Sequence, residues 1–130
     1  MKLQHIGLNI TEVSEVNHFY TNILKCWPEN NFELNETLSE KVFQQKHATQ
    51  VFTVRNTDLV LELFLSKEIN VQGFQHLCVS VCDRDHIAEK ARAYGYPVIR
   101  IAREGNDLLF IKDKAGNLFE LKNQAGENLS

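Results

Sequence analysis

An internal repeat is the feature that most limits what this chain can fold into. Residues 3–10, LQHIGLNI, are matched by residues 74–81, FQHLCVSV. Each run is typical of a β-strand, and each is followed by a polar cluster and then by a segment with helical spacing of its apolar residues. A repeat of this kind predicts that the chain contains two copies of one structural unit.

The segment after each repeated strand is expected to be a helix. In the first copy the helix is expected to be capped by Thr11 or Ser14 and to reach about Lys25. In the second copy Asp83 or Asp85 is expected to provide the cap, because a short polar side chain can accept hydrogen bonds from the first turn.

Further strands, separated by turn residues, follow each helix. The expected strands are 32–34, 50–55 and 59–65 in the first half and 98–102, 108–112 and 118–122 in the second. A short helical insertion is expected at 38–45. Both halves therefore read β-α-β-β-β, which is an α+β fold. We expect one domain over residues 1–122, with module one at about 1–66, module two at about 73–122 and a polar tail at 123–130.

Strand alternation places one histidine of each copy on the less apolar face of its strand. Ile6, Leu8 and Ile10 share the face that must pack on the helix of the module, and His5 lies on the opposite face. The second copy has the same pattern around His76. Both histidines are therefore expected to point away from the helices.

Each half also has one glutamate on its last strand. Glu62 lies within residues 59–65, LVLELFL, and Glu120 lies within residues 118–122, LFELK, so each is bracketed by apolar residues. A buried carboxylate without a partner is costly, so each is expected to meet a cation or take up a proton.

The two histidines and two glutamates form a set of four candidate metal ligands. A mixed nitrogen and oxygen set of this kind suits Zn²⁺, Ni²⁺, Co²⁺, Mn²⁺ or Fe²⁺. A single inward histidine is more often an ordinary core or pocket residue, and a single strand glutamate often faces water. The occurrence of His5, Glu62, His76 and Glu120 at matching places in two copies favours one divalent metal ion.

The same motifs resemble the vicinal oxygen chelate superfamily. Residues 5–10, HIGLNI, with Phe19, Tyr20 and Leu24 are similar to its opening strand and helix, and residues 113–121, DKAGNLFEL, are similar to its closing turn and strand. The resemblance covers residues 1–122. It implies paired βαβββ modules whose curved sheets form a cleft around a metal, and the His-Glu-His-Glu set is most similar to the glyoxalase I pattern of the bacterial type.

The resemblance implies a metal-dependent lyase or isomerase that moves a proton next to a carbonyl through a metal-stabilised enediolate. The substrate is expected to be a small molecule with vicinal oxygens. Glu120 is the first choice for the base and Glu62 is the second. A small-molecule binding or resistance protein on the same fold, or a related dioxygenase or transferase, is the alternative. A homodimer is favoured, although a chain with two modules can supply all four ligands alone.

Three positions depart from the bacterial glyoxalase I pattern. Asn9 stands where an arginine usually holds glutathione, Lys25 stands where glycine usually follows the last leucine of the first helix, and Lys114 replaces a proline of the closing turn. The absence of the arginine weighs against glutathione as the cosubstrate and leaves the substrate itself undetermined.

Several other residues are weaker candidates for substrate contact. Asn9 and Cys78 share the faces of the two histidines. Arg55, Arg100 and Lys112 lie on or near strands and are candidates for binding an anionic substrate, although basic residues on strand edges usually face water.

Composition excludes other classes of protein. A formal net charge of -3 and the lack of a basic run argue against a nucleic-acid partner. No apolar run approaches the roughly 20 residues that a membrane-spanning helix needs. The N-terminus does not have the pattern of a signal peptide, and the 3 cysteines have no framework spacing, so we expect a cytoplasmic protein with reduced thiols.

Overall fold

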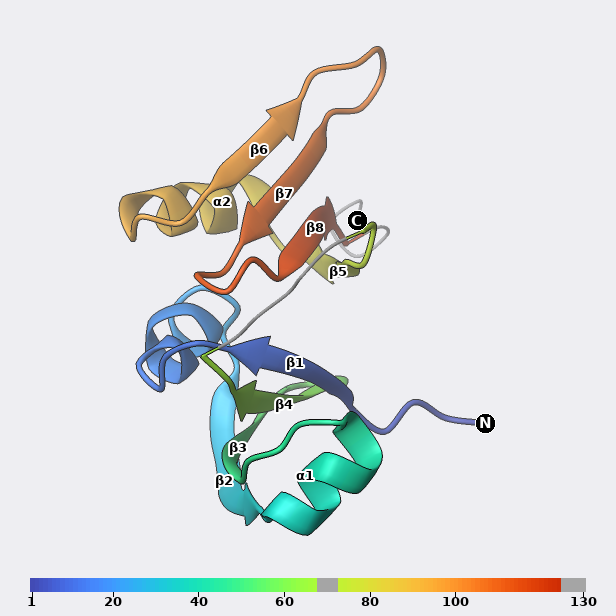
Figure 1. Cartoon of the computed structure of the whole chain (residues 1–130). Coiled ribbons are helices and arrows are strands. Elements are labelled where there is room, and N and C mark those ends of the chain that lie inside the picture. Colours follow the sequence, from blue (N-terminus) through green and yellow to red (C-terminus); the bar gives the residue numbers. More distant parts are fainter. Residues whose placement is uncertain (68–72, 125–130) are drawn as a thin grey trace. The chain divides into compact units, whose positions relative to one another are not determined.

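The computed structural model describes residues 1–67 and 73–124 (Figure 1). By its internal contacts the chain divides into two compact units, Met1–Ile69 and Asn70–Ser130.

Unit one is a four-stranded sheet with two short helical segments. Its elements are β1 (Ile6–Ile10), the π-helix η1 (Val16–Thr21), β2 (Trp27–Leu34), α1 (Glu36–Phe43), β3 (Thr49–Asn56) and β4 (Leu59–Leu65). The strand order in the sheet is β1-β4-β3-β2.

Unit two repeats this arrangement with one helix. Its elements are β5 (Leu77–Val81), α2 (Arg84–Ala93), β6 (Val98–Ile101), β7 (Leu108–Lys112) and β8 (Leu118–Asn123). The strand order is β5-β8-β7-β6, so the first and last strands of each unit are neighbours. The expected pair of βαβββ modules and the α+β fold class are therefore confirmed.

The strand register makes the two units equivalent residue by residue. The first and last strands run parallel in each unit, with Gly7 opposite Glu62 in unit one and Cys78 opposite Glu120 in unit two. The remaining pairings in each sheet are antiparallel. Since His5 precedes Gly7 by two residues and His76 precedes Cys78 by two, the equivalence predicted from the sequence holds in three dimensions.

The apolar residues of the last strands face the helical layer, as alternation requires. Leu61 and Leu63 of β4 are fully buried, and so are Phe119 and Leu121 of β8. The remaining core is completed by residues from the helices and inner strands, such as Phe19, Tyr20 and Ile23 in unit one and Ala88, Ala91, Leu109 and Ile111 in unit two. The glutamate between each pair of buried residues therefore lies on the other face.

The first helix differs from the expected one. The predicted α-helix up to Lys25 is a π-helix of six residues, in which the N–H of Leu24 bonds to the carbonyl of Phe19 five residues earlier. Its N-cap is Glu15, with no side-chain cap bond, so neither Thr11 nor Ser14 has the expected role. Hydrophobic periodicity places the buried face of a helix correctly but does not distinguish a four-residue from a five-residue hydrogen-bond step.

The end of this segment explains one departure from the family pattern. Lys25 has φ of 61°, in the left-handed region where glycine is favoured. In unit two, Gly95 occupies the corresponding place after α2 with φ of 90°. Asp83 caps α2 as expected, since its carboxylate accepts a hydrogen bond from the backbone N–H of His86 at 3.2 Å.

Other boundaries shift by a few residues. β2 begins at Trp27, five residues before the predicted strand at 32–34, and the helix predicted at 38–45 is α1. The backbone around His5 and His76 is not strand, so β1 and β5 begin one residue after each histidine. Asn123 ends β8 and so belongs to the fold, whereas residues 125–130 of the predicted tail lie outside the described residues.

In the part of the chain that the structure describes, no helix has the length and apolar character needed to cross a membrane.

Candidate metal centre

The unit-one pair, His5 and Glu62, is formed where the start of β1 meets β4. The Nε2 atom of His5 lies 3.2 Å from Oε1 of Glu62. The glutamate side chain is 20% exposed and the histidine 49%, so the carboxylate is partly sheltered while the imidazole is open. The parallel pairing of Gly7 with Glu62 positions the two side chains on the face opposite the buried leucines.

The unit-two pair, His76 and Glu120, repeats this geometry. The Nε2 atom of His76 lies 3.5 Å from Oε1 of Glu120, and the two side chains are 40% and 15% exposed. The His76 ring also packs edge-on against Phe110, with 6.5 Å between ring centroids. Phe110 pairs with Glu120 across β7 and β8, so these three side chains share one face.

The Nδ1 atom of His76 makes a hydrogen bond that fixes the tautomer of the neutral ring, and so the state of the Nε2 atom that faces Glu120. Nδ1 lies 2.8 Å from the backbone carbonyl of Phe74, and a carbonyl oxygen accepts hydrogen bonds, so Nδ1 must carry the proton. In the neutral imidazole, Nε2 then presents a lone pair to the carboxylate of Glu120. Two acceptors in this position need a proton or a metal ion between them, and metal-binding histidines commonly have such a carbonyl partner.

The distances within both pairs fit donors that share one ion. Two ligands that are each about 2.1 Å from an ion lie roughly 3.0–3.4 Å apart at octahedral or tetrahedral angles. The observed separations of 3.2 Å and 3.5 Å are close to this range. Two imidazoles and two carboxylates therefore fit a borderline divalent cation in both donor chemistry and spacing within each pair.

Each unit supplies two such donors. Among residues 1–67 and 73–124, no group of three or more His, Cys, Asp or Glu side chains is placed so as to hold a metal ion. The geometry thus shows one His-Glu pair in each unit, and the four-ligand site predicted from the sequence stays a prediction.

Three of the weaker substrate candidates lie on the same faces as the pairs. Asn9 follows Gly7 by two residues on β1, and Cys78 is exposed directly opposite Glu120. Lys112 lies two residues after Phe110 on β7 and therefore points to the Glu120 side of its sheet.

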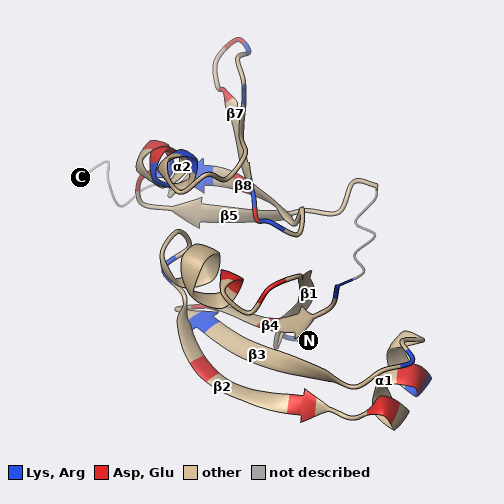
Figure 2. Cartoon of the chain, turned by 60° about the vertical axis from the view of Figure 1, so that its left-hand side comes forward, with Lys and Arg blue, Asp and Glu red and all other residues tan. Residues whose placement is uncertain are grey.

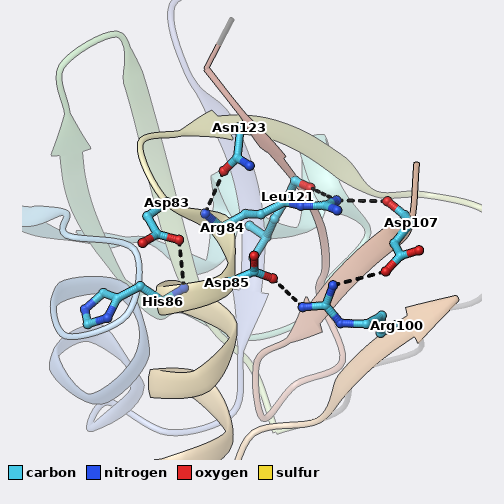
Figure 3. Close-up of polar contacts among 8 residues, drawn as sticks. All are labelled: Asp83, Arg84, Asp85, His86, Arg100, Asp107, Leu121 and Asn123. Atoms are coloured by element: carbon cyan, nitrogen blue, oxygen red, sulfur yellow. Dashed lines mark hydrogen bonds and ion pairs between the residues drawn. The ribbon is translucent and has the colours of Figure 1, made fainter. Parts of the chain in front are cut away.

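The two arginines are held by local carboxylates. Arg55 donates from Nε to Oε2 of Glu29 at 2.6 Å, and this hydrogen bond lowers the pKa of Glu29 below its usual range. Arg100 lies between Asp85 and Asp107, as Figure 3 shows, and its hydrogen bond likewise lowers the pKa of Asp85.

The position of Arg100 separates it from the unit-two pair. Arg100 is directly opposite the fully buried Leu109 in the β6–β7 register, and its partner Asp85 belongs to α2. Its side chain is therefore on the helix face of the sheet, whereas Glu120 is on the other face. This position does not favour Arg100 as a contact for a substrate beside Glu120.

A cavity of about 280 Å³ in unit one was not predicted from the sequence. It lies between α1 and the sheet, and its lining includes Gly7, Asn9 and Phe64 from the face that bears His5 and Glu62. His47 also lines it. The helical insertion at 38–45 was the available signal, but a pattern within a helix does not indicate which sheet face it covers.

A family model for the Glyoxalase/Bleomycin resistance protein/Dioxygenase superfamily matches residues 2–121. The chain therefore belongs to this superfamily, which confirms the resemblance seen in its motifs. Proteins with curated descriptions give no significant match.

Several solved structures have the same fold. The fosfomycin resistance protein FosX from Listeria monocytogenes is 15% identical, with 98% of this chain and 96% of that chain covered and a TM-score of 0.73. A mutant of that protein, in complex with Mn(II) and 1S,2S-dihydroxypropylphosphonic acid, is 16% identical over 98% and 95% of the two chains, also at 0.73. A glyoxalase family protein from Bacillus cereus is 14% identical over 97% and 95%, at 0.72. At these identities the likeness shows the fold alone.

Proposed function

We propose that this protein is a metal-dependent lyase or isomerase that moves a proton between carbons next to a carbonyl group of a small substrate with vicinal oxygens. His5, Glu62, His76 and Glu120 are the proposed ligands of one divalent ion, which is Zn²⁺, Ni²⁺, Co²⁺, Mn²⁺ or Fe²⁺. The Mn(II) in the FosX mutant complex supports a divalent ion on this fold.

The observation that carries the proposal is the tautomer of His76. Its Nδ1 donates to the Phe74 carbonyl, so the Nε2 lone pair faces the carboxylate of Glu120. The same His-Glu relationship recurs between His5 and Glu62 at the equivalent place in the other unit. The acceptor-to-acceptor contact at His76, together with the same His-Glu pairing at His5, supports cation binding rather than an ordinary surface histidine.

A divalent ion bound by these residues would act as a Lewis acid that stabilises the enediolate formed from the substrate. The carboxylates of this chain would move the proton. Glu120 is our first choice for the base because it is the less exposed of the two glutamates, at 15% against 20% for Glu62. A less exposed carboxylate is less accessible to bulk water, which protects the transferred proton from exchange with solvent. Glu62 is the second choice.

Metal content measured by mass spectrometry tests the ligand set. After incubation with each candidate ion and removal of the excess, the wild type is expected to retain one ion per chain. The His5→Ala/Glu120→Ala variant is expected to retain none. His86→Ala/Glu89→Ala is the matched control, since both residues are exposed on α2. Equal metal content in all three proteins, or none in the wild type with any ion, would contradict the proposal.

The remaining step is to test turnover. Metal-loaded protein would be screened against 2-oxoaldehydes with added thiols and against 2-oxoacid thioesters, with proton exchange followed by NMR in deuterated water. If the Glu120→Gln variant keeps both its metal and full activity on a confirmed substrate, Glu120 is not the base.

A second function is favoured by one observation. The Glu120 face of unit two carries Lys112 and Lys122, which flank the carboxylate on β7 and β8. Two cations beside a His-Glu pair suit an anionic small molecule, as expected of a resistance protein related in fold to FosX. Conversion of fosfomycin by the metal-loaded protein, abolished in a Lys112→Met/Lys122→Met variant, would favour this alternative over the lyase or isomerase.

Two further expectations accompany the proposed function. The four-ligand site needs both units, which one chain or two copies in a homodimer can supply, and analytical ultracentrifugation with and without metal distinguishes these arrangements. The cytoplasm is the proposed compartment, and it is supported by Cys26, Cys78 and Cys82 all being free thiols.

A further inference from the structure

We infer that the cavity beneath α1 binds an uncharged, apolar part of the substrate, such as an aromatic ring or a short branched acyl group. This inference rests on the proposed function, because it places the substituent of the same substrate whose oxygens the metal would hold. It follows from the position, the lining and the charge of the cavity.

The cavity begins next to the unit-one pair on the same face of the sheet. Gly7 lines it and pairs directly with Glu62, and Phe64 lines it two residues beyond Glu62 along β4. Two residues along a strand span roughly 7 Å. A substrate whose oxygens lie at His5 and Glu62 would therefore have its substituent at the cavity entrance, two to four bonds from the reacting carbon.

The helix α1 forms the outer wall. Asn35 caps it by accepting a hydrogen bond from the N–H of Leu38 at 2.9 Å. Ser39 and Phe43, one helical turn apart, both line the cavity, and Ser39 is only 2% exposed. Module two has no helix between β6 and β7, so this wall is a feature of unit one alone among the described residues.

Two aromatic rings and a glycine form the apolar side of the cavity. The rings of Phe43 and Phe64 lie with centroids 5.4 Å apart at 56°. A Cβ atom at Gly7 would come within 3.1 Å of the Phe64 ring, so the glycine allows that ring to lie across β1. A planar or branched apolar group would gain favourable contact with such rings.

Leu34 and Leu65 complete the apolar lining. The other lining residues are polar but carry no formal charge apart from a titratable histidine, and they are Asn9, Ser39, Gln45, His47, Thr49 and Ser66. The charged residues of α1, coloured in Figure 2, are not among the lining residues, and neither is any other lysine, arginine, aspartate or glutamate. A buried ionic group would find no opposite charge here, which disfavours a substituent with carboxylates, such as those of glutathione.

The volume sets a limit on size. At about 280 Å³ the cavity is at the small end of ligand pockets, which hold drug-sized molecules at roughly 300–1,000 Å³. It therefore suits a single ring or a short acyl chain rather than a peptide or a nucleotide.

The test uses three probes with one ring and different charge, which are benzyl alcohol, benzoate and benzylamine. Binding is followed by ¹H–¹⁵N NMR on the full chain with a chelator present, so that no metal contributes. Benzyl alcohol is expected to shift the amides of Phe43, Thr49 and Phe64, with affinity about tenfold or more above that of the charged probes. Equal or stronger binding of benzoate or benzylamine, or shifts confined to other residues, would overturn the inference.

A matched pair of variants on α1 completes the test. Phe43→Asp places a charge in the cavity wall and is expected to weaken benzyl alcohol binding about tenfold or more. Val42→Asp adds the same charge to the same helix at a side chain that is 58% exposed and does not line the cavity, and it should bind like the wild type. Similar binding by the two variants would also overturn the inference. Because metal is absent, failure here leaves the metal test unaffected, and the reverse holds too.

Discussion

The two units of this protein share a topology and a His-Glu pair but differ in what surrounds that pair. Each sheet places a histidine before its first strand within 3.5 Å of a glutamate on its last. Beyond that pair, unit one has Phe64 and the cavity under α1, whereas unit two has Lys122 at the position equivalent to Phe64. The comparison teaches that the His-Glu pair repeats while its surroundings differ between the units, apolar in one and cationic in the other.

The largest expected effect concerns which glutamate moves the proton. With a confirmed substrate, Glu120→Gln is expected to lower kcat by about 100- to 10,000-fold, because a positioned general base typically contributes a rate enhancement of that size. Glu62→Gln should lower kcat less and weaken metal retention more. Steady-state kinetics at saturating metal measures both. A larger kcat loss for Glu62→Gln would exchange the roles of the two units.

The next effect concerns the turns before the last strands. In unit two the buried carboxylate of Asp113 accepts from the backbone N–H of Asn117 at 2.7 Å and from its side-chain amide at 2.8 Å. Asp113→Ala is expected to lower the free energy of unfolding by about 2–3 kcal/mol, since the buried amide loses its partner. In unit one, Asn56 donates to the carbonyl of Leu24 at 2.8 Å, and Asn56→Ala should cost only about 1 kcal/mol.

Urea denaturation followed by circular dichroism measures both turn variants. Equal losses would mean that the turns contribute alike despite their different burial. His86→Ala is a suitable surface control for the unit-two variant, because its side chain is exposed.

A smaller effect concerns the residues that end the first helices. Lys25 has φ of 61° and Gly95 has φ of 90°, so only unit two has the residue that this conformation favours. Lys25→Gly is expected to raise the free energy of unfolding by about 0.5–1 kcal/mol, and Gly95→Ala to lower it by about 1–2 kcal/mol. No atom lies within 4 Å of a Cβ at Gly95, so the penalty would be conformational rather than steric. Thermal unfolding measures the Tm of both variants. A higher Tm for Lys25→Gly and a lower Tm for Gly95→Ala would confirm the comparison, and changes of the same sign would contradict it.

The smallest expected effect involves no change in stability and concerns the reactivity of the cysteine thiols in the two units. Burial raises the pKa of Cys26 in unit one to about 11, whereas Cys78 and Cys82 in unit two are exposed. The thiolate is the reactive form, so at pH 8 iodoacetamide should label Cys78 and Cys82 in the folded protein and Cys26 only after unfolding. Peptide mass spectrometry reads each site, and early labelling of Cys26 would contradict its burial.

Much of the fold could be predicted because it depends on alternation and repetition. The faces of His5, Glu62, His76 and Glu120 follow from a period of two, and their equivalence follows from the match between 3–10 and 74–81. These are local properties of the sequence that the register of the sheets preserves.

The rest depends on contacts between elements, which periodicity does not encode. The five-residue hydrogen-bond step of η1, the position of α1 over the sheet and the capture of Arg100 by Asp85 are all of this kind. A basic residue on a strand gives no sign in the sequence of which carboxylate it will meet. For the same reason the sequence placed Arg55 and Arg100 in one group with Lys112, although their surroundings differ.

The parallel pairing of first and last strands has a consequence for how this protein folds. Each His-Glu pair joins the two ends of its unit, so it is among the contacts of greatest sequence separation and is expected to form late in folding. A metal ion bound there as proposed would not nucleate folding of the chain, unlike the ion of a zinc finger, which folds its own small domain. Refolding should therefore proceed at the same rate with and without metal, and the ion should act by slowing unfolding.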